Sequence, residues 1–290
     1  MSRVSAYVAL TKPRIIELLL VTTLPTMVVA QRGLPPVWLM VVTVAGGTLA
    51  AGGANAINMV VDRDIDAKMP RTKDRPLVTG AVTPGAALVF AILLEIGAFA
   101  LLWSTVNLLS AVLAISATAF YVFVYTMWLK RTSTHNIVIG GAAGAVPVLV
   151  GWAAVQNRLG LAPFLLFAVI FAWTPPHFWA LAIRYRDEYA SVDVPMLPAV
   201  ASHKSTSRQI TVYTVVLWAI SLAFAPAAHM GLLYVVAATV LGAVFLWYAV
   251  ALQRDGSEPA KPAMRLFHYS ITYVTLLFAA MAVDQLIRGH

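Results

Sequence analysis

The sequence predicts an all-α fold, a polytopic membrane helix bundle with two polar cytoplasmic caps. Of the 290 residues, 60% are apolar and 11% are charged, and the mean hydropathy is +0.82. A soluble domain typically carries about 25% charged residues, so this chain lacks the surface charge of a soluble protein. Apolar runs of about 20 residues, each long enough to cross a hydrocarbon core of ~30 Å, recur along the whole chain.

The apolar runs predict about nine transmembrane helices in a single domain that covers residues 1–290. No low-complexity stretch and no long linker divides the chain. The spans are expected at residues 13–31, 37–59, 85–105, 108–128, 135–155, 161–183, 209–227, 230–252 and 266–287.

The basic residues orient this bundle. With nine spans, 17 of the 20 Lys and Arg residues fall on one side, and only Arg32, Arg158 and Arg288 fall on the other. Because short cytoplasmic loops retain Lys and Arg, the N-terminus and both caps are expected in the cytoplasm and the C-terminus outside, in a cell (cytoplasmic) membrane. The net charge of +8 then reflects topology and anionic lipid headgroups. Membrane lipid, not nucleic acid, is the expected partner.

The first cap, residues 60–84, begins with stacked oxygen ligands. Asn58, Asp62 and Asp66 are spaced i, i+4, i+8, so a continuing helix would place them on one face, about 6 Å apart. Neighbouring carboxylates repel, and a positive group is expected between them. Carboxylate and amide oxygens without sulfur suit a hard ion such as Mg²⁺, and the absence of cysteine excludes a thiolate site.

Cations follow these ligands in the same loop. Arg71, Lys73 and Arg75 offer donors for phosphate oxygens, and Pro76 stops any helix. Acids that hold a metal, followed by cations that hold phosphate, indicate a diphosphate site. The alternative is a charged loop in which Asp and Arg only pair with one another.

The second cap, residues 184–208, offers three more acids on the same side of the membrane. They are Asp187, Glu188 and Asp193. They could coordinate a second Mg²⁺ on the same diphosphate; on its own, such a group is more often a solvated loop.

His177 is the most informative histidine. It follows Pro175–Pro176, which is expected to kink the sixth span and free backbone carbonyls, and it lies among aromatic residues that include Trp179. Aromatic surroundings with one imidazole suit a flat macrocycle with an axial ligand. The alternative is a core histidine bonded to a freed carbonyl. His203 could serve phosphate or heme propionates, and Arg265 lies beside a secondary heme candidate, His268.

The chain resembles the intramembrane aromatic prenyltransferase superfamily, and specifically its heme branch, the protoheme IX farnesyltransferases. The resemblance covers nearly the whole chain. It rests on residues 10–14, 58–77, 136–141, 175–179, 195–198 and 265–267, with Asp284 near the end. Pro-Pro-His-Phe-Trp at 175–179 and Pro-Met-Leu-Pro at 195–198 are specific to the heme branch, whereas the Asn-x-x-x-Asp-x-x-x-Asp run indicates only the superfamily.

The resemblance implies transfer of farnesyl from farnesyl diphosphate to a vinyl group of heme b, with water addition, to give heme O for heme-copper oxidases. Asn58, Asp62 and Asp66, with Asp187 and Glu188, would hold Mg²⁺, and Arg71 and Arg75 would join the first three in catalysis. Heme b is then a substrate, not a cofactor, and a heme A synthase is a possible partner. The implied substrate-binding residues are Lys12, Arg14, Lys73, His177, Trp179, Arg184, Tyr185, Asp187, Glu188, Tyr189, His203 and Arg265.

Two departures bear on the acceptor and the metal. Quinone-type relatives carry Asp directly after the Asn, where this chain has Met59, which favours heme over a quinone precursor. Relatives usually end the second acidic pair in Asp, where this chain has Glu188, and usually have Gly where Asp193 stands. Which acid of the second cap coordinates metal is therefore open.

Rival interpretations come from other classes of protein. A transporter predicts carboxylates near the bilayer midplane, but here only Glu95 is deep. A heme-binding membrane protein without catalysis has no use for a diphosphate cap. A quinone or chlorophyll prenyltransferase remains within the same enzyme class.

Overall fold

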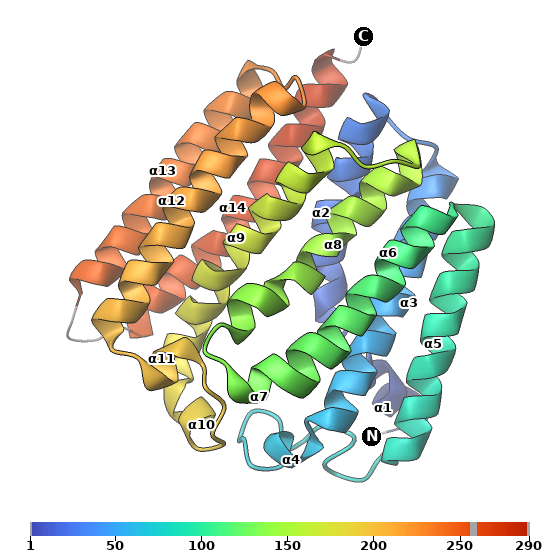
Figure 1. The fold of residues 1–290 in the computed structure, drawn as a ribbon, viewed down its shortest axis with the longest axis vertical. Coiled ribbons are helices and arrows are strands. Elements are labelled where there is room, and N and C mark those ends of the chain that lie inside the picture. Colours follow the sequence, from blue (N-terminus) through green and yellow to red (C-terminus); the bar gives the residue numbers. More distant parts are fainter. Residues whose placement is uncertain (1, 256–259, 289–290) are drawn as a thin grey trace.

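A computed structural model describes residues 2–255 and 260–288, apart from the side chains of residues 14–20. Within this part, every regular element is helical (Figure 1). The long helices are α2 (Arg14–Gln31), α3 (Val37–Val61), α5 (Pro84–Thr105), α6 (Leu108–Ala119) continued by the π-helix η1 (Phe120–Leu129) and α7 (Lys130–Thr132), α8 (Asn136–Gln156), α9 (Leu161–Arg184), α12 (His203–Ala227), α13 (Leu232–Arg254) and α14 (Ala260–Arg288).

These helices confirm the predicted membrane bundle. Eight helical stretches of the described residues are long and apolar enough to cross a membrane, and each lies at a predicted span. The 18-residue helix α2 occupies the place of the first predicted span. The N-terminal helix α1 (Arg3–Leu10) lies at the lower end of the bundle, whereas α14 ends at the upper end (Figure 1). Ends on opposite faces agree with an odd number of crossings.

The outward surface of the bundle is apolar, as lipid contact requires. On α5, Val89, Leu93, Ile96 and Trp103 follow one helical stripe, and each is more than half exposed. Such a stripe would be an aggregation-prone patch in water and is ordinary in a bilayer.

Helix boundaries differ from the prediction where polar residues begin a helix. α12 starts at His203, six residues before the predicted span, because the Ser202 hydroxyl accepts a hydrogen bond from the Ser205 amide at 3.2 Å. The end of the second predicted cap is therefore helical. Likewise α14 starts at Ala260 and includes Arg265.

The short elements gather at the end of the bundle that carries α1. They are α4 (Arg63–Asp66), α10 (Arg186–Ala190) and α11 (Leu197–Val200) (Figure 1). α4 continues from α3, and α10 and α11 follow α9, so both predicted caps lie at one end. α9 itself runs through Pro175–Pro176 without interruption.

Candidate active site

Asn58, Asp62 and Asp66 share one buried face, as their spacing predicts. α3 ends at Val61, but the helical hydrogen bonds continue from the Asp62 amide to the Asn58 carbonyl (2.9 Å) and from the Asp66 amide to the Asp62 carbonyl (2.8 Å). All three residues are buried, at no more than 3% exposure. Asp64 points the other way and is exposed, as expected from its position on the helix.

Positive groups do lie against these carboxylates, and they come from the protein itself. Lys130 forms an ion pair with Asp62 Oδ2, and Arg131 approaches Asp62 Oδ1 to 3.7 Å. Arg75 pairs with Asp66 Oδ2 at 2.6 Å. The repulsion between the stacked acids is thereby offset by three cations from two parts of the chain.

Lys12 reaches the same cluster from the turn between α1 and α2. Its Nζ donates to Asn58 Oδ1 at 3.0 Å, and Asn58 Nδ2 donates to Asp62 Oδ2 at 2.7 Å. The pKa of Lys12 is lowered to about 7, first by burial and then by the nearby charges of Arg75 and Lys130, against the opposing effect of the acids. Lys12 thus lies in the site, whereas the side chain of Arg14 is outside the described residues.

Sequence reasoning missed Lys130 and Arg131. Both follow the fourth predicted span, on the same predicted side of the membrane as the two caps. The sequence therefore indicated where they lie, but it did not indicate that they pair with Asp62. The ten-residue π-helix η1 leads into them. Tyr121 and Tyr125 of η1 stack at 5.3 Å between ring centroids. π-helical segments occur frequently at functional sites.

Arg71 joins the two caps. Its guanidinium donates to the Tyr189 hydroxyl at 3.2 Å across 118 residues of sequence, and it lies 4.8 Å from the centre of the Tyr185 ring. Glu188 Oε2 lies 4.0 Å from Arg71 Nε. The two caps therefore meet where Arg71, a candidate phosphate-binding residue of the first cap, contacts Tyr185, Glu188 and Tyr189 of the second cap.

The three acids of the second cap have different surroundings. Asp187 is 95% exposed and pairs with Arg186, so its side chain points away from the first cap's acids. Glu188 faces Arg71, and its Oε2 is buried without a hydrogen bond. Asp193 has a left-handed φ of 55°, a conformation that favours glycine.

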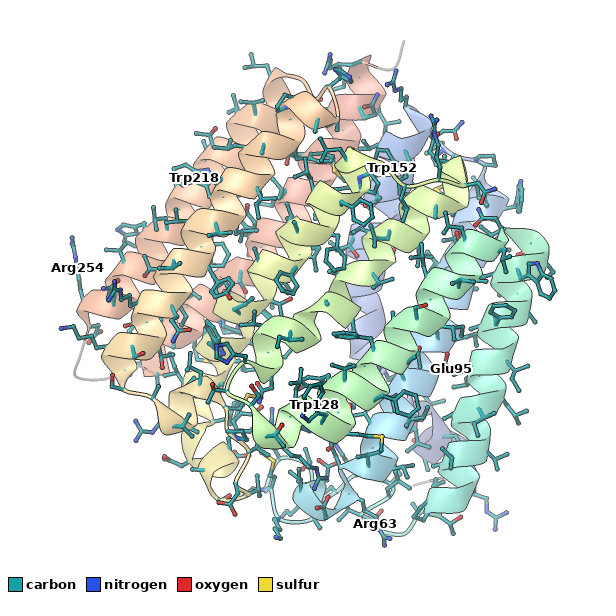
Figure 2. The ribbon with its side chains drawn as sticks, in the orientation of Figure 1. Arg63, Glu95, Trp128, Trp152, Trp218 and Arg254 are labelled. Carbon is teal, nitrogen blue, oxygen red and sulfur yellow. The ribbon has the colours of Figure 1, made fainter. Side chains whose placement is uncertain are left out.

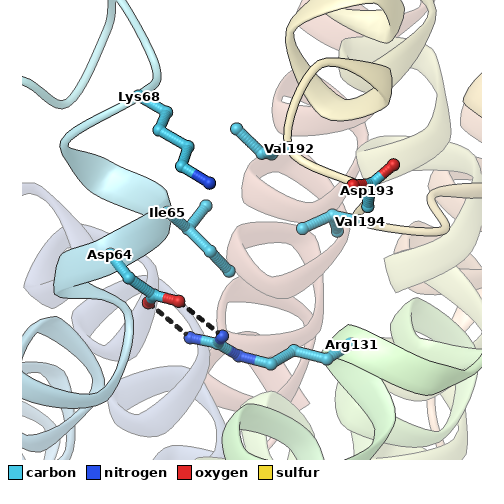
Figure 3. Close-up of a pocket in the computed structure, with 7 residues that line it drawn as sticks. All are labelled: Asp64, Ile65, Lys68, Arg131, Val192, Asp193 and Val194. Carbon is cyan, nitrogen blue, oxygen red and sulfur yellow. Dashed lines mark hydrogen bonds and ion pairs between the residues drawn. The ribbon is translucent and has the colours of Figure 1, made fainter.

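A pocket of about 190 Å³ lies at the seam between the caps (Figure 3). Asp64 and Lys68 line it from the first cap, Arg131 from α7, and Val192 and Asp193 from the second cap. Arg131 binds both oxygens of Asp64 at 2.7 and 2.8 Å, and this hydrogen bonding lowers the pKa of Asp64 to about 2. The pair fixes α7 against α4.

The acids fit a metal that is held in part by its substrate. The described residues contain no cluster of three His, Asp or Glu side chains able to hold a metal by themselves. However, Asp62 Oδ1 and Glu188 Oε2 are buried acceptors without hydrogen bonds. Mg²⁺ commonly binds through one or two carboxylates together with substrate phosphate oxygens, so a free oxygen on Asp62 matches that mode of binding.

His177 lies in α9, stacked between Trp173 (4.2 Å) and Phe267 (4.6 Å). Its Nδ1 lies 2.7 Å from the hydroxyl oxygen of Ser270 in α14. This contact differs from the alternative expected from the sequence, in which His177 would bond to a backbone carbonyl freed by proline.

The remaining predicted substrate residues do not contact the acidic stack. Trp179 is buried against Tyr213, and His203 Nε2 lies 3.2 Å from the Leu252 carbonyl. The exposed cations of this group are Lys73, Arg184 and Arg265. Arg184 lies 5.9 Å from the Tyr185 ring.

The family model that matches this chain is that of the UbiA prenyltransferase family, over residues 19–271. The chain belongs to the UbiA prenyltransferase family. Relatives in it include the protoheme IX farnesyltransferase of Streptomyces coelicolor, 52% identical over 99% of this chain and 92% of the relative, and that of a Parafrankia species, 55% identical over 98% and 91%.

Solved UbiA-type structures share the fold. A digeranylgeranylglyceryl phosphate synthase has a TM-score of 0.81 at 15% identity, over 99% of this chain and all of that one. An Archaeoglobus fulgidus UbiA homolog bound to GPP and Mg²⁺ has a TM-score of 0.62 at 13% identity, over 95% of this chain and 99% of that one. At such identities, the likeness concerns the fold.

Proposed function

We propose that this protein transfers the farnesyl group of farnesyl diphosphate to a vinyl group of heme b and adds water, forming heme O and diphosphate. The observation that carries the proposal is the buried Asn58–Asp62–Asp66 stack surrounded by cations at the capped end of an apolar bundle. The shared name of relatives above 50% identity supplies the acceptor.

The cations bind the diphosphate. Lys12, Arg71, Arg75 and Lys130 come from three parts of the chain and surround the acids. Asp62 and Asp66, with Asn58 and Glu188, would hold Mg²⁺, which supplies Lewis-acid charge to the leaving group. As the diphosphate binds, Lys130 and Arg75 are expected to exchange part of their contact with the acids for phosphate oxygens.

The reaction breaks the allylic C1–O bond, and the electron pair leaves with diphosphate. A carbon–carbon bond forms from the heme vinyl group to C1, and water captures the resulting cation with release of one proton. Water must be excluded from the first cation and admitted to the second, and the two caps joined by Arg71 would control this access. The farnesyl tail would lie between helices, open to lipid.

The acceptor side of the proposal concerns α9 and the cytoplasmic end of α14. His177 would ligate the heme iron, and Arg265 would face a propionate. Met59, which replaces the Asp of quinone-type relatives, is buried among Ala6 and Leu10 of α1, so no carboxylate of that kind lies beside Asn58. We place the caps and the N-terminus in the cytoplasm on the charge asymmetry, with the C-terminus outside.

Product analysis tests the proposal. Purified protein in lipid nanodiscs is incubated with heme b, farnesyl diphosphate and Mg²⁺, and products are separated and weighed by mass spectrometry. We expect hydroxyethylfarnesyl heme, lost with EDTA and in Asp62→Asn. Asp74→Asn, an exposed acid of the same cap, is the matched control and should keep activity.

Two results would change the proposal. Prenylation of an added phenolic acid without prenylation of heme would keep the diphosphate site and overturn the acceptor. No transfer to any acceptor would overturn the enzyme and favour a transporter or a heme carrier.

A further inference from the structure

The imidazole of His177 is held on both faces and at one edge. Trp173 covers one face at an interplanar angle of 21° and Phe267 covers the other at 29°. The edge with Nδ1 contacts the Ser270 hydroxyl at 2.7 Å. The Phe178 ring lies at 90° to the imidazole, with 5.2 Å between the centroids. The side chain keeps partial exposure, and Nε2 makes no hydrogen bond within the described residues.

Counting protons assigns the tautomer of this ring. Ser270 Oγ lies 2.6 Å from the Phe267 carbonyl oxygen, which can only accept. The hydroxyl has one proton, and it goes to that carbonyl. Ser270 must therefore accept from His177, so the proton of the imidazole lies on Nδ1 and the lone pair on Nε2.

We infer that Ser270 is a positioning residue, which fixes His177 as a neutral ligand with Nε2 free for the iron of the heme acceptor. The inference rests on the proposed function and adds to it a residue of α14 and a defined protonation state. Metal-bound histidines almost always donate their other ring N–H to a hydrogen-bond acceptor, which orients the ring and raises its basicity.

The stacking decides how a porphyrin can approach. Because both faces of the imidazole are covered, a macrocycle cannot lie flat on the ring. A metal–imidazole bond lies in the plane of the ring, so the open Nε2 edge allows coordination and leaves both stacks intact. Ligation, not stacking, is thus the contact that His177 is arranged to make.

A second hydrogen bond holds Ser270, which accepts the proton of His177, in place. Trp173 Nε1 donates to the backbone carbonyl of Ser270 at 2.8 Å, so α9 is tied to α14 through both the hydroxyl and the main chain of one residue. Ser270 is fully buried. Bulk water therefore does not compete for its hydroxyl.

Heme b binding without farnesyl diphosphate tests the inference apart from catalysis. Protein in nanodiscs is titrated with ferric heme b and followed by its Soret band, with resonance Raman of the ferrous complex reporting the iron–histidine stretch. Ser270→Ala and the nearly isosteric Ser270→Cys are expected to weaken heme binding about 10- to 100-fold and to lower the stretching frequency. Ser270→Thr, which keeps the hydroxyl, should keep the wild-type band.

Ser221→Ala is the matched control. Ser221 is also a fully buried helix serine, but it bonds Tyr273 and the Leu217 carbonyl. It should leave the heme spectrum unchanged. Wild-type heme affinity and spectrum in both Ser270→Ala and Ser270→Cys, or an equal loss in Ser221→Ala, would overturn the inference.

The proposed function can fail separately. If His177→Ala binds heme b with the wild-type spectrum, His177 is not the ligand and Ser270 has no role through it, while farnesyl transfer and the diphosphate site stand. If the Ser270 variants show the expected changes in heme binding but the wild-type protein transfers no farnesyl, the positioning role stands and the reaction does not.

Discussion

At the scale of single residues, Asp62 has the most constrained environment in the site. It is fully buried. Its Oδ2 accepts hydrogen bonds from Asn58 and Lys130, whereas its Oδ1 accepts none. A buried carboxylate depends strongly on its partners, because removing one leaves an uncompensated charge. Lys130 is therefore a structural counter-ion of Asp62, and we propose that it also binds diphosphate.

Lys130→Met should separate these roles. It is expected to lower the free energy of unfolding by about 3–5 kcal/mol, the usual cost of breaking a buried pair, and to abolish transfer. The double variant Lys130→Met/Asp62→Asn should recover much of the stability but no activity. Thermal unfolding in detergent and product analysis measure the two effects; unchanged stability and turnover in the single variant would contradict this role.

At the scale of elements, the π-helix η1 delivers Lys130 to Asp62, and α8 supports it. Gly140 of α8 lies against the Tyr125 ring, and an added Cβ there would come within 3.0 Å of three ring carbons. Gly144, one turn further on the same helix, has open space around it. The two glycines thus provide a matched comparison.

Gly140→Ala is expected to displace η1 and cost about 1–3 kcal/mol of stability, as overpacking does, with a fall in farnesyl transfer. Gly144→Ala should be neutral or slightly stabilising. Unfolding midpoints and initial rates of the two variants check this, and equal behaviour of both would show that the contact with Tyr125 does not position Lys130.

The far end of the bundle has a structural acid, Asp284. Its carboxylate is buried and accepts hydrogen bonds from the Gly231 amide (2.6 Å) and the Tyr234 amide (3.3 Å), so α14 caps the start of α13. This contact explains an acid within a membrane span without a catalytic role.

Asp284→Ala should destabilise without altering the chemistry. The unpaired amides are expected to cost about 1–3 kcal/mol, while KM for farnesyl diphosphate and the metal dependence stay unchanged in the folded protein. Thermal unfolding and steady-state kinetics measure these separately. A changed KM at unchanged stability would point instead to coupling between the two ends of the bundle.

Glu95 lies about half-way along the bundle (Figure 2). Its carboxyl oxygens are buried and lie against Gly53 of α3. It is remote from the capped end where Arg63 lies (Figure 2). A single deep acid at a helix crossing does not form the pathway that a transporter needs.

At the scale of the whole molecule, two caps from different halves of the chain close over one end of the bundle. Arg71 connects them through Tyr185, Glu188 and Tyr189. Because Arg71 combines a hydrogen bond, ring contact and charge, lysine cannot replace it fully.

Arg71→Lys should therefore loosen the caps while keeping the charge. We expect KM for farnesyl diphosphate to rise several-fold and hydrogen exchange in residues 184–196 to increase, while Arg186→Lys, an exposed pair with Asp187, serves as the control. Hydrogen-exchange mass spectrometry and kinetics measure both effects. Unchanged exchange in Arg71→Lys would mean that other contacts hold the caps together.

Features of this protein that depend on local repetition could be predicted from the sequence alone. Hydropathy predicted the spans, and the four-residue spacing predicted the stack of Asn58, Asp62 and Asp66, because helical periodicity relates near neighbours. The family motifs identified the enzyme class. The same local signals also indicated that both caps lie on one side of the membrane.

Only the tertiary structure decided which distant residues meet. The pairs Lys130–Asp62, Arg71–Tyr189 and His177–Ser270 are 68, 118 and 93 residues apart. No spacing rule relates such positions, since helix packing and the π-helical geometry of η1 set their distances. For the same reason, the sequence could not show that Glu188 faces the first cap while Asp187 faces solvent.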